Sequence, residues 1–313
     1  MRPVPAVDAL LAGMHCTPIF RFMTMEELGD WCRARLAKLP LRAFRDPAPV
    51  VSVLRLSGVI GRIGPAGSGM TLAGMERAIE RAFRGRNLKA VALAVNSPGG
   101  APVQASLIAG RIRALAVEKE LPVIAFAEDV AASGGYWLAC AADEIYADES
   151  SVIGSIGVVS SGFGFPDLLA RAGVERRVHS SGRRKAMLDP FRPEEPEDVA
   201  RLHSIQADIH ESFKRHVRLR RGARLAAPES ELFEGDIWTG GQALALGLID
   251  GIGDVRGVLR ERFGERVKLR PVSVRVSPLA RLFGRGRGVA AAEGAHAVIA
   301  ALEEWARWRR FGL

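Results

Sequence analysis

The chain has 313 residues, which is enough for one large domain with extensions or for two small domains. Its 48% hydrophobic and 25% charged residues are typical of a folded globular protein and exclude disorder along the whole chain. The net charge of +9 indicates either an acidic partner or an arginine-rich solvated surface. Because no zinc-finger spacing, RNP-like motif or basic zipper accompanies this charge, no nucleic-acid partner is expected.

The first 48 residues predict a helical extension ahead of the main domain. Thr24 and Glu27 have the spacing of a capping box, and apolar residues then follow at helical spacing up to Leu39. No run of 18 apolar residues occurs, and no signal-peptide pattern opens the chain. We therefore expect no transmembrane helix, and a protein that is cytoplasmic or peripheral on the inner membrane. Three cysteines without a C-x-x-C do not predict a disulfide framework or a cysteine metal site.

Residues 49–265 predict the core domain, because strands and helices alternate there. Strands are expected at Val50–Leu56, Lys89–Val95, Pro122–Ala127 and Glu144–Ala147, and helices at Leu72–Phe83, Val103–Val117 and Ser133–Ala142. Such alternation indicates right-handed βαβ units in an α/β fold with a mostly parallel sheet. Ligands of such sheets bind beyond the carboxyl ends of the strands.

The rest of the core predicts a long charged helix and a turn-rich unit. The helix spans residues 196–221, and the turn-rich unit spans residues 225–254 and is interpreted as structural. Residues 266–313 predict a C-terminal extension, with a strand at Val267–Val276, a Gly/Arg-rich linker and a final basic amphipathic helix over 289–310. Such a helix can lie on an anionic membrane or pack against a partner, and both alternatives stay open.

A pair of glycines follows the strand Lys89–Val95, in the motif Asn96-Ser97-Pro98-Gly99-Gly100. Glycines at a strand end let backbone N–H groups approach a ligand closely, and the next helix brings its positive dipole end near them. Such N–H groups can stabilise an oxyanion. A plain turn also explains these residues.

Ser133 lies in Ala131-Ala132-Ser133-Gly134-Gly135-Tyr136, where a helix is expected to begin. Serine is a frequent N-cap, so this residue can be purely structural. The motif is not the G-x-S-x-G elbow because Ala131 takes the place of the first glycine, which disfavours an α/β-hydrolase. In the next small-residue motif, Ser155 can orient a catalytic base or belong to an ordinary turn.

Lys185 ends the basic motif Ser181-Gly182-Arg183-Arg184-Lys185, and a lysine in such a loop is normally exposed. A lysine that acts as a general base must lose its charge, so its pKa must fall from about 10.4 to near 7, at a cost of about 4 kcal/mol. Burial by Ala186–Leu188 and the charge of the neighbouring arginines would act in that direction. None of the six histidines lies in a triad motif, and exposure is expected for three on the long charged helix, His203, His210 and His216.

Five motifs in order resemble the protease IV or signal peptide peptidase A family of serine proteases. They are N-S-P-G-G, A-S-G-G-Y, G-S-I-G-V, S-G-x-x-K and W-T-G-x-x-A-x-x-x-G-L-I-D, within Pro49–Phe263. Each motif is weak alone, and the ordered set is specific. The resemblance implies a Clp/crotonase-like fold of repeated ββα units.

The resemblance also implies a Ser–Lys dyad, with Ser133 as nucleophile and Lys185 as general base. Gly100 and Gly134 would supply oxyanion-hole N–H groups, and Ser155 would orient the base. No metal, nucleotide or other cofactor is implied. The implied partners are short or unfolded peptides, such as signal-peptide remnants, and further copies of the chain, between which the dyad can be shared. Family members usually carry an N-terminal membrane anchor, which this sequence does not show, so the terminal helices can provide peripheral membrane contact instead.

Three other functions stay open. A crotonase-like enzyme would use the same glycine N–H groups on an acyl-CoA thioester, and would need a CoA site. A non-catalytic, membrane-linked scaffold would assemble without hydrolysing any peptide. A phage capsid-maturation protease would be a proteolytic variant of the same family.

Overall fold

The computed structural model describes residues 47–62, 69–273, 306 and 308–311. The predicted extension over residues 1–48 lies almost entirely outside the described residues, as do Cys16, Cys32 and the Gly/Arg-rich linker. Of the final predicted helix, only the few residues from 306 onward are described. The chain divides between Ala48 and Pro49, and all elements below belong to the part after this point.

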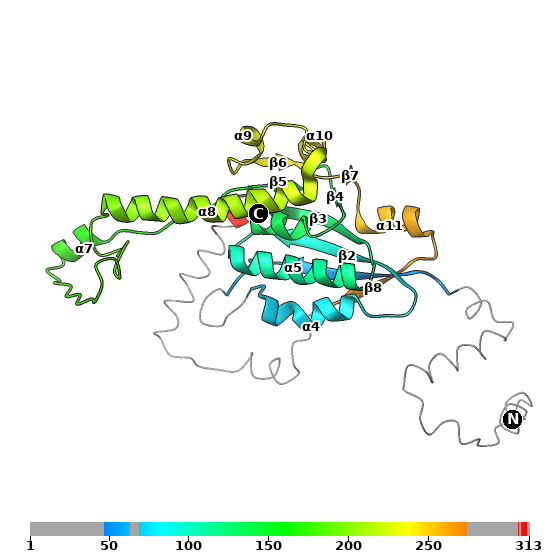
Figure 1. The fold of residues 1–313 in the computed structure, drawn as a ribbon, viewed down its shortest axis with the longest axis horizontal. Coiled ribbons are helices and arrows are strands. Elements are labelled where there is room, and N and C mark those ends of the chain that lie inside the picture. Colours follow the sequence, from blue (N-terminus) through cyan, green and yellow to red (C-terminus); the bar gives the residue numbers. More distant parts are fainter. Residues whose placement is uncertain (1–46, 63–68, 274–305, 307, 312–313) are drawn as a thin grey trace, which may run out of the picture. The chain divides into compact units, whose positions relative to one another are not determined.

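Eight described strands form one sheet in which the path β6-β5-β3-β2-β1-β8 is extended by β4 and β7 (Figure 1). The strands are β1 (Val50–Ser57), β2 (Leu88–Ser97), β3 (Val123–Ala132), β4 (Glu144–Ala147), β5 (Val152–Gly154), β6 (Ile237–Thr239), β7 (Gly251–Ile252) and β8 (Lys268–Val272). Every pairing is parallel except that of β5 with β6. The mostly parallel α/β fold class is therefore confirmed.

The helices alternate with these strands as the sequence indicated. They are α4 (Leu72–Ala82), α5 (Pro102–Glu118), α6 (Gly134–Ala139), α7 (Pro166–Arg171), α8 (Pro196–Arg221), α9 (Glu229–Leu232), α10 (Gly240–Ala245) and α11 (Val255–Phe263). The bounds of α8 match the predicted helix at both ends. Five elements, β5, α7, α9, β7 and α11, were not predicted, and β3 runs five residues beyond its predicted end at Ala127.

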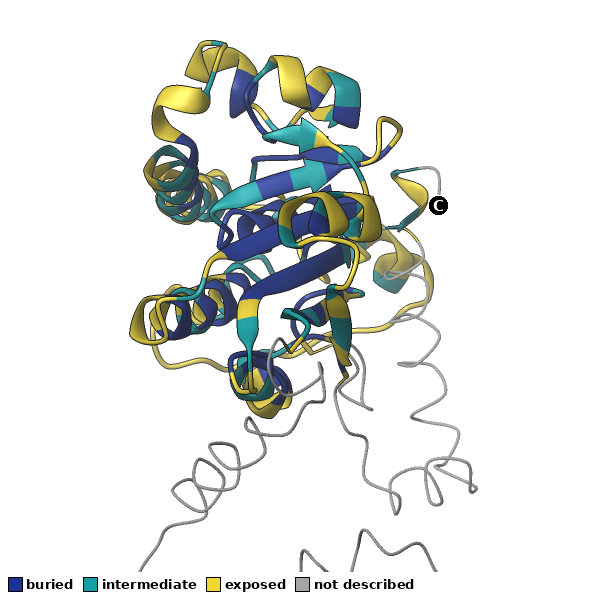
Figure 2. Cartoon of the chain, turned by 90° about the vertical axis from the view of Figure 1, so that its right-hand side faces the viewer, coloured by how far each residue is buried: buried dark blue, intermediate teal, exposed yellow. Residues whose placement is uncertain are grey.

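The sheet is buried on both faces, which explains why its central strands are almost continuously apolar. In β2, Val91, Leu93 and Val95 face the cluster formed with α4, α5 and α6. Ala90 and Ala92 face the opposite cluster, which includes residues of α11. Figure 2 shows the buried strands in the centre with the partly exposed helices around them.

The strand β3 carries two different neighbours on the same edge. Its first part, Ile124–Ala127, pairs with β4, and its last residues, Val130–Ala132, pair with β5. Two consecutive strands therefore line one long strand, and this strand ends directly before Ser133. At the other side of the sheet, β8 pairs with β1, so this strand of the predicted C-terminal extension completes the core sheet.

Residues 158–195, called the arm below, extend away from the sheet beyond the amino end of α8 (Figure 1). The helix α7 in this arm has no buried residue. The aromatic rings of the arm contact one another, with centroid distances of 6.3 Å for Phe163–Phe165 and 5.7 Å for Phe165–Phe191. Phe163 is 79% exposed, so the arm presents apolar surface that the described part of the chain does not cover.

Within the described part of the chain, no helix combines the length and the hydrophobicity that crossing a bilayer requires.

Candidate active site

Ser133 occupies the sharp turn between β3 and α6, with φ 53° and ψ −123°. A positive φ is rare for a residue with a side chain and costs about 1–3 kcal/mol, so neighbouring contacts must hold it. The Ser133 N–H donates to the Gly154 carbonyl at 2.7 Å, and its carbonyl accepts from the Trp137 N–H at 3.0 Å. Its side chain makes no N-cap hydrogen bond, so capping does not explain this serine.

The glycine loop of the first motif packs directly against this turn. A β-carbon built on Gly99 would lie 2.7 Å from the Ser133 β-carbon and 3.0 Å from its Oγ. On Gly100, a β-carbon would lie 2.0 Å from the Ile60 carbonyl oxygen. Both glycines have positive φ, 102° and 140°. The close approach and the backbone conformation therefore both require glycine.

Two backbone N–H groups lie beside each other at this turn. Ile60 donates to the Gly99 carbonyl at 2.8 Å and Ala101 donates to the Ile60 carbonyl at 2.9 Å, while the intervening Gly100 N–H donates to no described residue. The Gly134 N–H opens α6 and therefore has no intrahelical acceptor. A β-carbon built on Gly134 would lie 3.4 Å from the Gly100 nitrogen. Two such donors next to a hydroxyl are the arrangement that stabilises an oxyanion.

Ser155 directly follows Gly154, whose carbonyl accepts the hydrogen bond from the Ser133 N–H. It is buried, with 4% exposure, and has φ 52°. Its N–H donates to the Asp236 carbonyl at 2.6 Å. A β-carbon on Gly154 would lie 2.5 Å from the Trp238 ring. The turn-rich unit, which the sequence suggested was only structural, thus supports the segment that holds Ser133 and Ser155.

Lys185 is not brought to Ser133 within one chain. It is exposed and lies on the arm. Three residues later, the Leu188 N–H donates to Asp198 at the amino end of α8. Ser133 lies near the other half of α8, because the Trp137 carbonyl meets His216 at 3.1 Å. From position 198 to 216 a helix rises by about 27 Å, at about 1.5 Å per residue.

The histidines of α8 correct one expectation from the sequence. His203 is exposed as expected, whereas His210 and His216 are half-buried. Each hydrogen-bonds a backbone carbonyl, His210 that of Ile156 at 3.2 Å and His216 that of Trp137. Burial lowers the pKa of His216 to about 4, so at neutral pH it is uncharged and its Nε2–H donates. The exposure prediction failed because α8 packs on the core along its carboxyl half.

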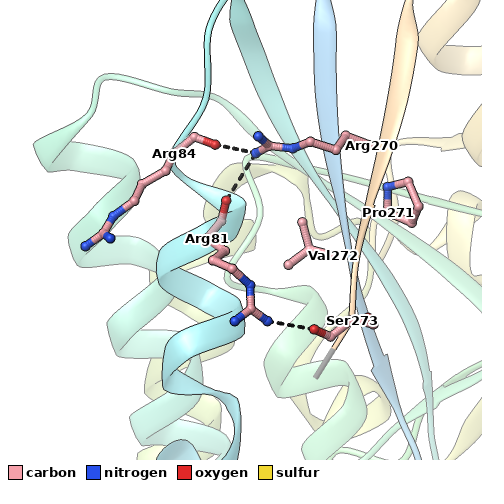
Figure 3. A pocket seen from close by; sticks show the side chains of 6 residues that line it. All are labelled: Arg81, Arg84, Arg270, Pro271, Val272 and Ser273. Carbon is pink, nitrogen blue, oxygen red and sulfur yellow. Dashed lines mark hydrogen bonds between the residues drawn. The ribbon is translucent and has the colours of Figure 1, made fainter. Parts of the chain in front are cut away.

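The pocket drawn in Figure 3 lies away from this site. It is lined by Arg81, Arg84, Arg270, Pro271, Val272 and Ser273, and has a volume of about 340 Å³. Arg270 donates to the Arg81 carbonyl at 3.1 Å and to the Arg84 carbonyl, so it caps the end of α4. Because α4 ends where β2 begins, this pocket lies at the amino ends of the parallel strands, opposite the end that carries Ser133.

Sequence reasoning missed Ile60 as a residue of the site, and it missed the contact that Gly99 makes there. The backbone of Ile60 hydrogen-bonds the residues on both sides of Gly100, namely Gly99 and Ala101, and its Cδ1 atom would lie 3.0 Å from a β-carbon on Gly134. The available signal was the apolar pair between Gly58 and Gly61 after the first strand. Gly99 was seen as part of a motif, but its contact with Ser133 depends on the pairing of β2 with β3.

Comparison with known proteins places the chain in a family. The family model described as peptidase family S49 matches residues 116–268, a range that includes Ser133, Ser155 and Lys185. The "Putative protease slr0021" of Synechocystis sp. is 32% identical over 190 residues, which cover 59% of this chain and 67% of that protein. The "Serine protease SPPA, chloroplastic" of Arabidopsis thaliana is 33% identical over 208 residues, or 65% of this chain and 30% of that protein.

A relative with a different name matches over a longer range. The "Na(+)/H(+) antiporter NhaA" of Brucella abortus is 46% identical over 287 residues, which cover 89% of this chain and 39% of that protein. The chain thus spans about two fifths of the length of this relative. Because the shared segment includes most of the region matched by the family model, the similarity is to a peptidase-like segment. The chain belongs to peptidase family S49.

Proposed function

We propose that the chain is a serine endopeptidase that hydrolyses peptide bonds in short or unfolded peptides, among them remnants of signal peptides. The observation that carries this proposal is the turn at Ser133, where a strained serine, two packed glycines and the N–H groups of Gly100 and Gly134 meet. In this proposal Ser133 attacks the peptide carbonyl, and the two N–H groups bind the oxygen on which negative charge develops.

The proposed general base is Lys185 of a second copy of the chain. This choice is supported by the length of α8 that separates the arm from Ser133 in one chain, and by the apolar surface on the arm that a second copy would cover. Burial against that copy would remove water from the lysine amine and favour its uncharged form. Ser155, buried beside the turn, would then orient the incoming amine.

The proposed reaction proceeds through an acyl-enzyme. The uncharged lysine amine takes the Ser133 hydroxyl proton as Oγ bonds to the carbonyl carbon, and the protonated lysine then gives this proton to the leaving amine as the peptide bond breaks. Water next attacks the ester carbonyl and gives a proton to the lysine. That proton passes to Ser133 Oγ as the carboxylic acid product leaves.

Labelling with a fluorophosphonate, followed by peptide mapping, tests the nucleophile. We expect the label on Ser133, and no label in Ser133→Ala, with both proteins equally folded by circular dichroism. Labelling at another serine, or binding of CoA without any labelling, would contradict the proposal.

Mixing two inactive variants tests the shared dyad. Ser133→Ala retains Lys185, and Lys185→Ala retains Ser133, so a mixed assembly can contain complete sites. With random mixing of equal amounts we expect about one quarter of the wild-type activity, because about one site in four pairs an intact serine with an intact lysine. If the mixture stays inactive while mass measurements show mixed assemblies, the dyad is not shared between copies.

A further inference from the structure

The helix α6, which begins directly after Ser133, is held at its other end by arginines from two longer helices. Arg220 of α8 donates through Nε to the Cys140 carbonyl at 2.9 Å and through Nη2 to the Ala142 carbonyl at 2.8 Å. Arg113 of α5 donates to the Ala141 carbonyl at 3.3 Å. Three successive carbonyls in the turn directly after α6, which ends at Ala139, therefore accept hydrogen bonds from guanidinium groups.

Asp143 joins these two arginines to the strand that leads to Ser133. Its Oδ1 accepts from Arg113 at 2.7 Å and from Arg220 at 3.1 Å. Its Oδ2 accepts from the Val123 N–H at 2.9 Å, at the first residue of β3. We call Arg113, Asp143 and Arg220 the α6 clamp.

The clamp is placed where a short helix needs support. Six residues form little more than one and a half turns. The N–H groups of Cys140, Ala141 and Ala142 already donate to the last α6 carbonyls, so the carbonyls of these three residues are the ones that need other donors. Cys140, Ala141 and Ala142 are themselves buried, so water cannot easily serve their carbonyls. Cations near the carboxyl end of a helix also interact favourably with its dipole.

The topology connects the clamp to the catalytic turn. Ser133 connects the last residue of β3 to the first residue of α6. The clamp connects the first residue of β3 to the turn that follows α6. The Ser133 conformation costs energy and persists only where surrounding structure holds it. A loosened clamp would let α6 shift along its axis, which would move the Gly134 N–H and the Ser133 hydroxyl together.

We propose that Arg113, Asp143 and Arg220 are positioning residues, which hold α6 so that the Ser133 hydroxyl and the Gly134 N–H meet the substrate carbonyl in register. The proposal rests on the peptidase function proposed above, and it adds three residues that touch neither the substrate nor the reacting atoms.

The test compares Arg220→Ala, Arg220→Lys and Arg218→Ala in the full chain. Arg218 is the matched control, because it lies on the same helix but pairs with Glu211 and Glu229 instead of α6. Peptide hydrolysis and the rate of fluorophosphonate labelling are measured well below the unfolding temperature of each variant. Hydrogen exchange of peptides covering residues 131–139 is measured on the same samples.

For Arg220→Ala we expect kcat and the labelling rate to fall about tenfold to a hundredfold with KM unchanged, since displacements of about 1 Å cost that much. Exchange over residues 131–139 should become faster. Arg220→Lys should recover only part of the loss, because an ammonium cannot reproduce the planar, two-carbonyl contact. Arg218→Ala should match the wild type in all three measurements.

Wild-type kcat and wild-type exchange in a folded Arg220→Ala protein would overturn the clamp. If the wild type itself is never labelled at Ser133, the peptidase proposal fails, and unchanged exchange in Arg220→Ala would overturn the clamp separately. Should Arg220→Ala not fold, Asp143→Asn gives the same comparison, because it removes the carboxylate charge that joins the two arginines.

Discussion

Gly99 and Ser133 touch each other: a β-carbon on Gly99 would approach the Ser133 β-carbon to 2.7 Å and the Gly134 nitrogen to 2.9 Å. These distances are shorter than nonbonded carbon contacts allow. The glycine loop and the serine turn are thus a single packed unit, formed by the ends of two neighbouring parallel strands. The chemistry proposed for this site depends on that contact.

Gly99→Ala should therefore inactivate the protein. The added methyl group must push the Ser133 turn or the Gly134 N–H away, and the φ of 102° is strained for alanine. We expect a fall in fluorophosphonate labelling of about 100-fold or more, the effect of losing an oxyanion-hole donor. We also expect a loss of about 1–3 kcal/mol in the free energy of unfolding.

Gly264→Ala is the matched control, since Gly264 also has a positive φ, 84°, but faces open space. It should lose stability only, with labelling unchanged once the protein is folded. Full labelling of Gly99→Ala would show that the contact with Ser133 is not needed for reactivity.

Two buried serines near the site should respond differently to loss of their hydroxyl groups. Ser155→Ala should lower kcat about tenfold or more with little effect on stability, if its hydroxyl orients the base. Ser151 donates to the Glu128 carbonyl at 2.5 Å, so Ser151→Ala should cost about 1–3 kcal/mol of stability and leave kcat unchanged. Steady-state kinetics and urea unfolding of both variants separate these effects. Equal kinetics for the two variants would remove Ser155 from the mechanism.

The buried ion pair between Arg221 and Asp250 should be costly to break. Arg221 is 3% exposed, contacts Asp250 at 2.6 Å and donates twice to the Gly247 carbonyl. Arg221→Ala leaves Asp250 with Arg224 at 3.4 Å and the Ile145 N–H, and takes both guanidinium donors from the Gly247 carbonyl. We therefore expect a loss at the low end of about 3–5 kcal/mol in urea unfolding. Replacing both residues, as in Arg221→Leu with Asp250→Leu, should cost less than Arg221→Ala alone. A larger loss in the double variant would contradict this account.

His216 should make the protein less stable in mild acid. Its pKa is about 4 in the folded chain and 6.5 as an ordinary value, so between these pH values the unfolded state binds a proton that the folded state does not. His216 therefore makes its full contribution to the free energy of unfolding above pH 6.5. This contribution falls as the pH drops toward 4, by about 3 kcal/mol in total. Urea unfolding from pH 7 to 4.5 measures this slope.

His216→Gln should lose that part of the pH dependence while other titrating groups remain the same. Its slope between pH 6.5 and 4.5 should be shallower than that of the wild type. Parallel slopes for the two proteins would show that His216 is not the responsible group.

Local hydrophobic patterns were sufficient to predict those strands and helices whose burial produces a regular pattern in the sequence. The strands of the core were predicted from apolar runs because both faces of the sheet are buried, and α8 was predicted with its correct bounds. Short elements were missed. β5 has three residues and exists because it pairs with the end of β3, and α7 has no buried face to produce a pattern.

For the site, the sequence by itself determined which residues are candidates: the glycine pair, Ser133, Ser155 and Lys185, in an order that matches one family. Only the tertiary structure decided which of them meet. Parallel pairing of β2 with β3 brings Gly99, Gly100 and Ser133 to the same edge, whereas the arm carries Lys185 away from it. The physical reason is that a motif reflects only the backbone conformation that its own residues must adopt. The distances between motifs are set by strand pairing and helix packing between distant segments.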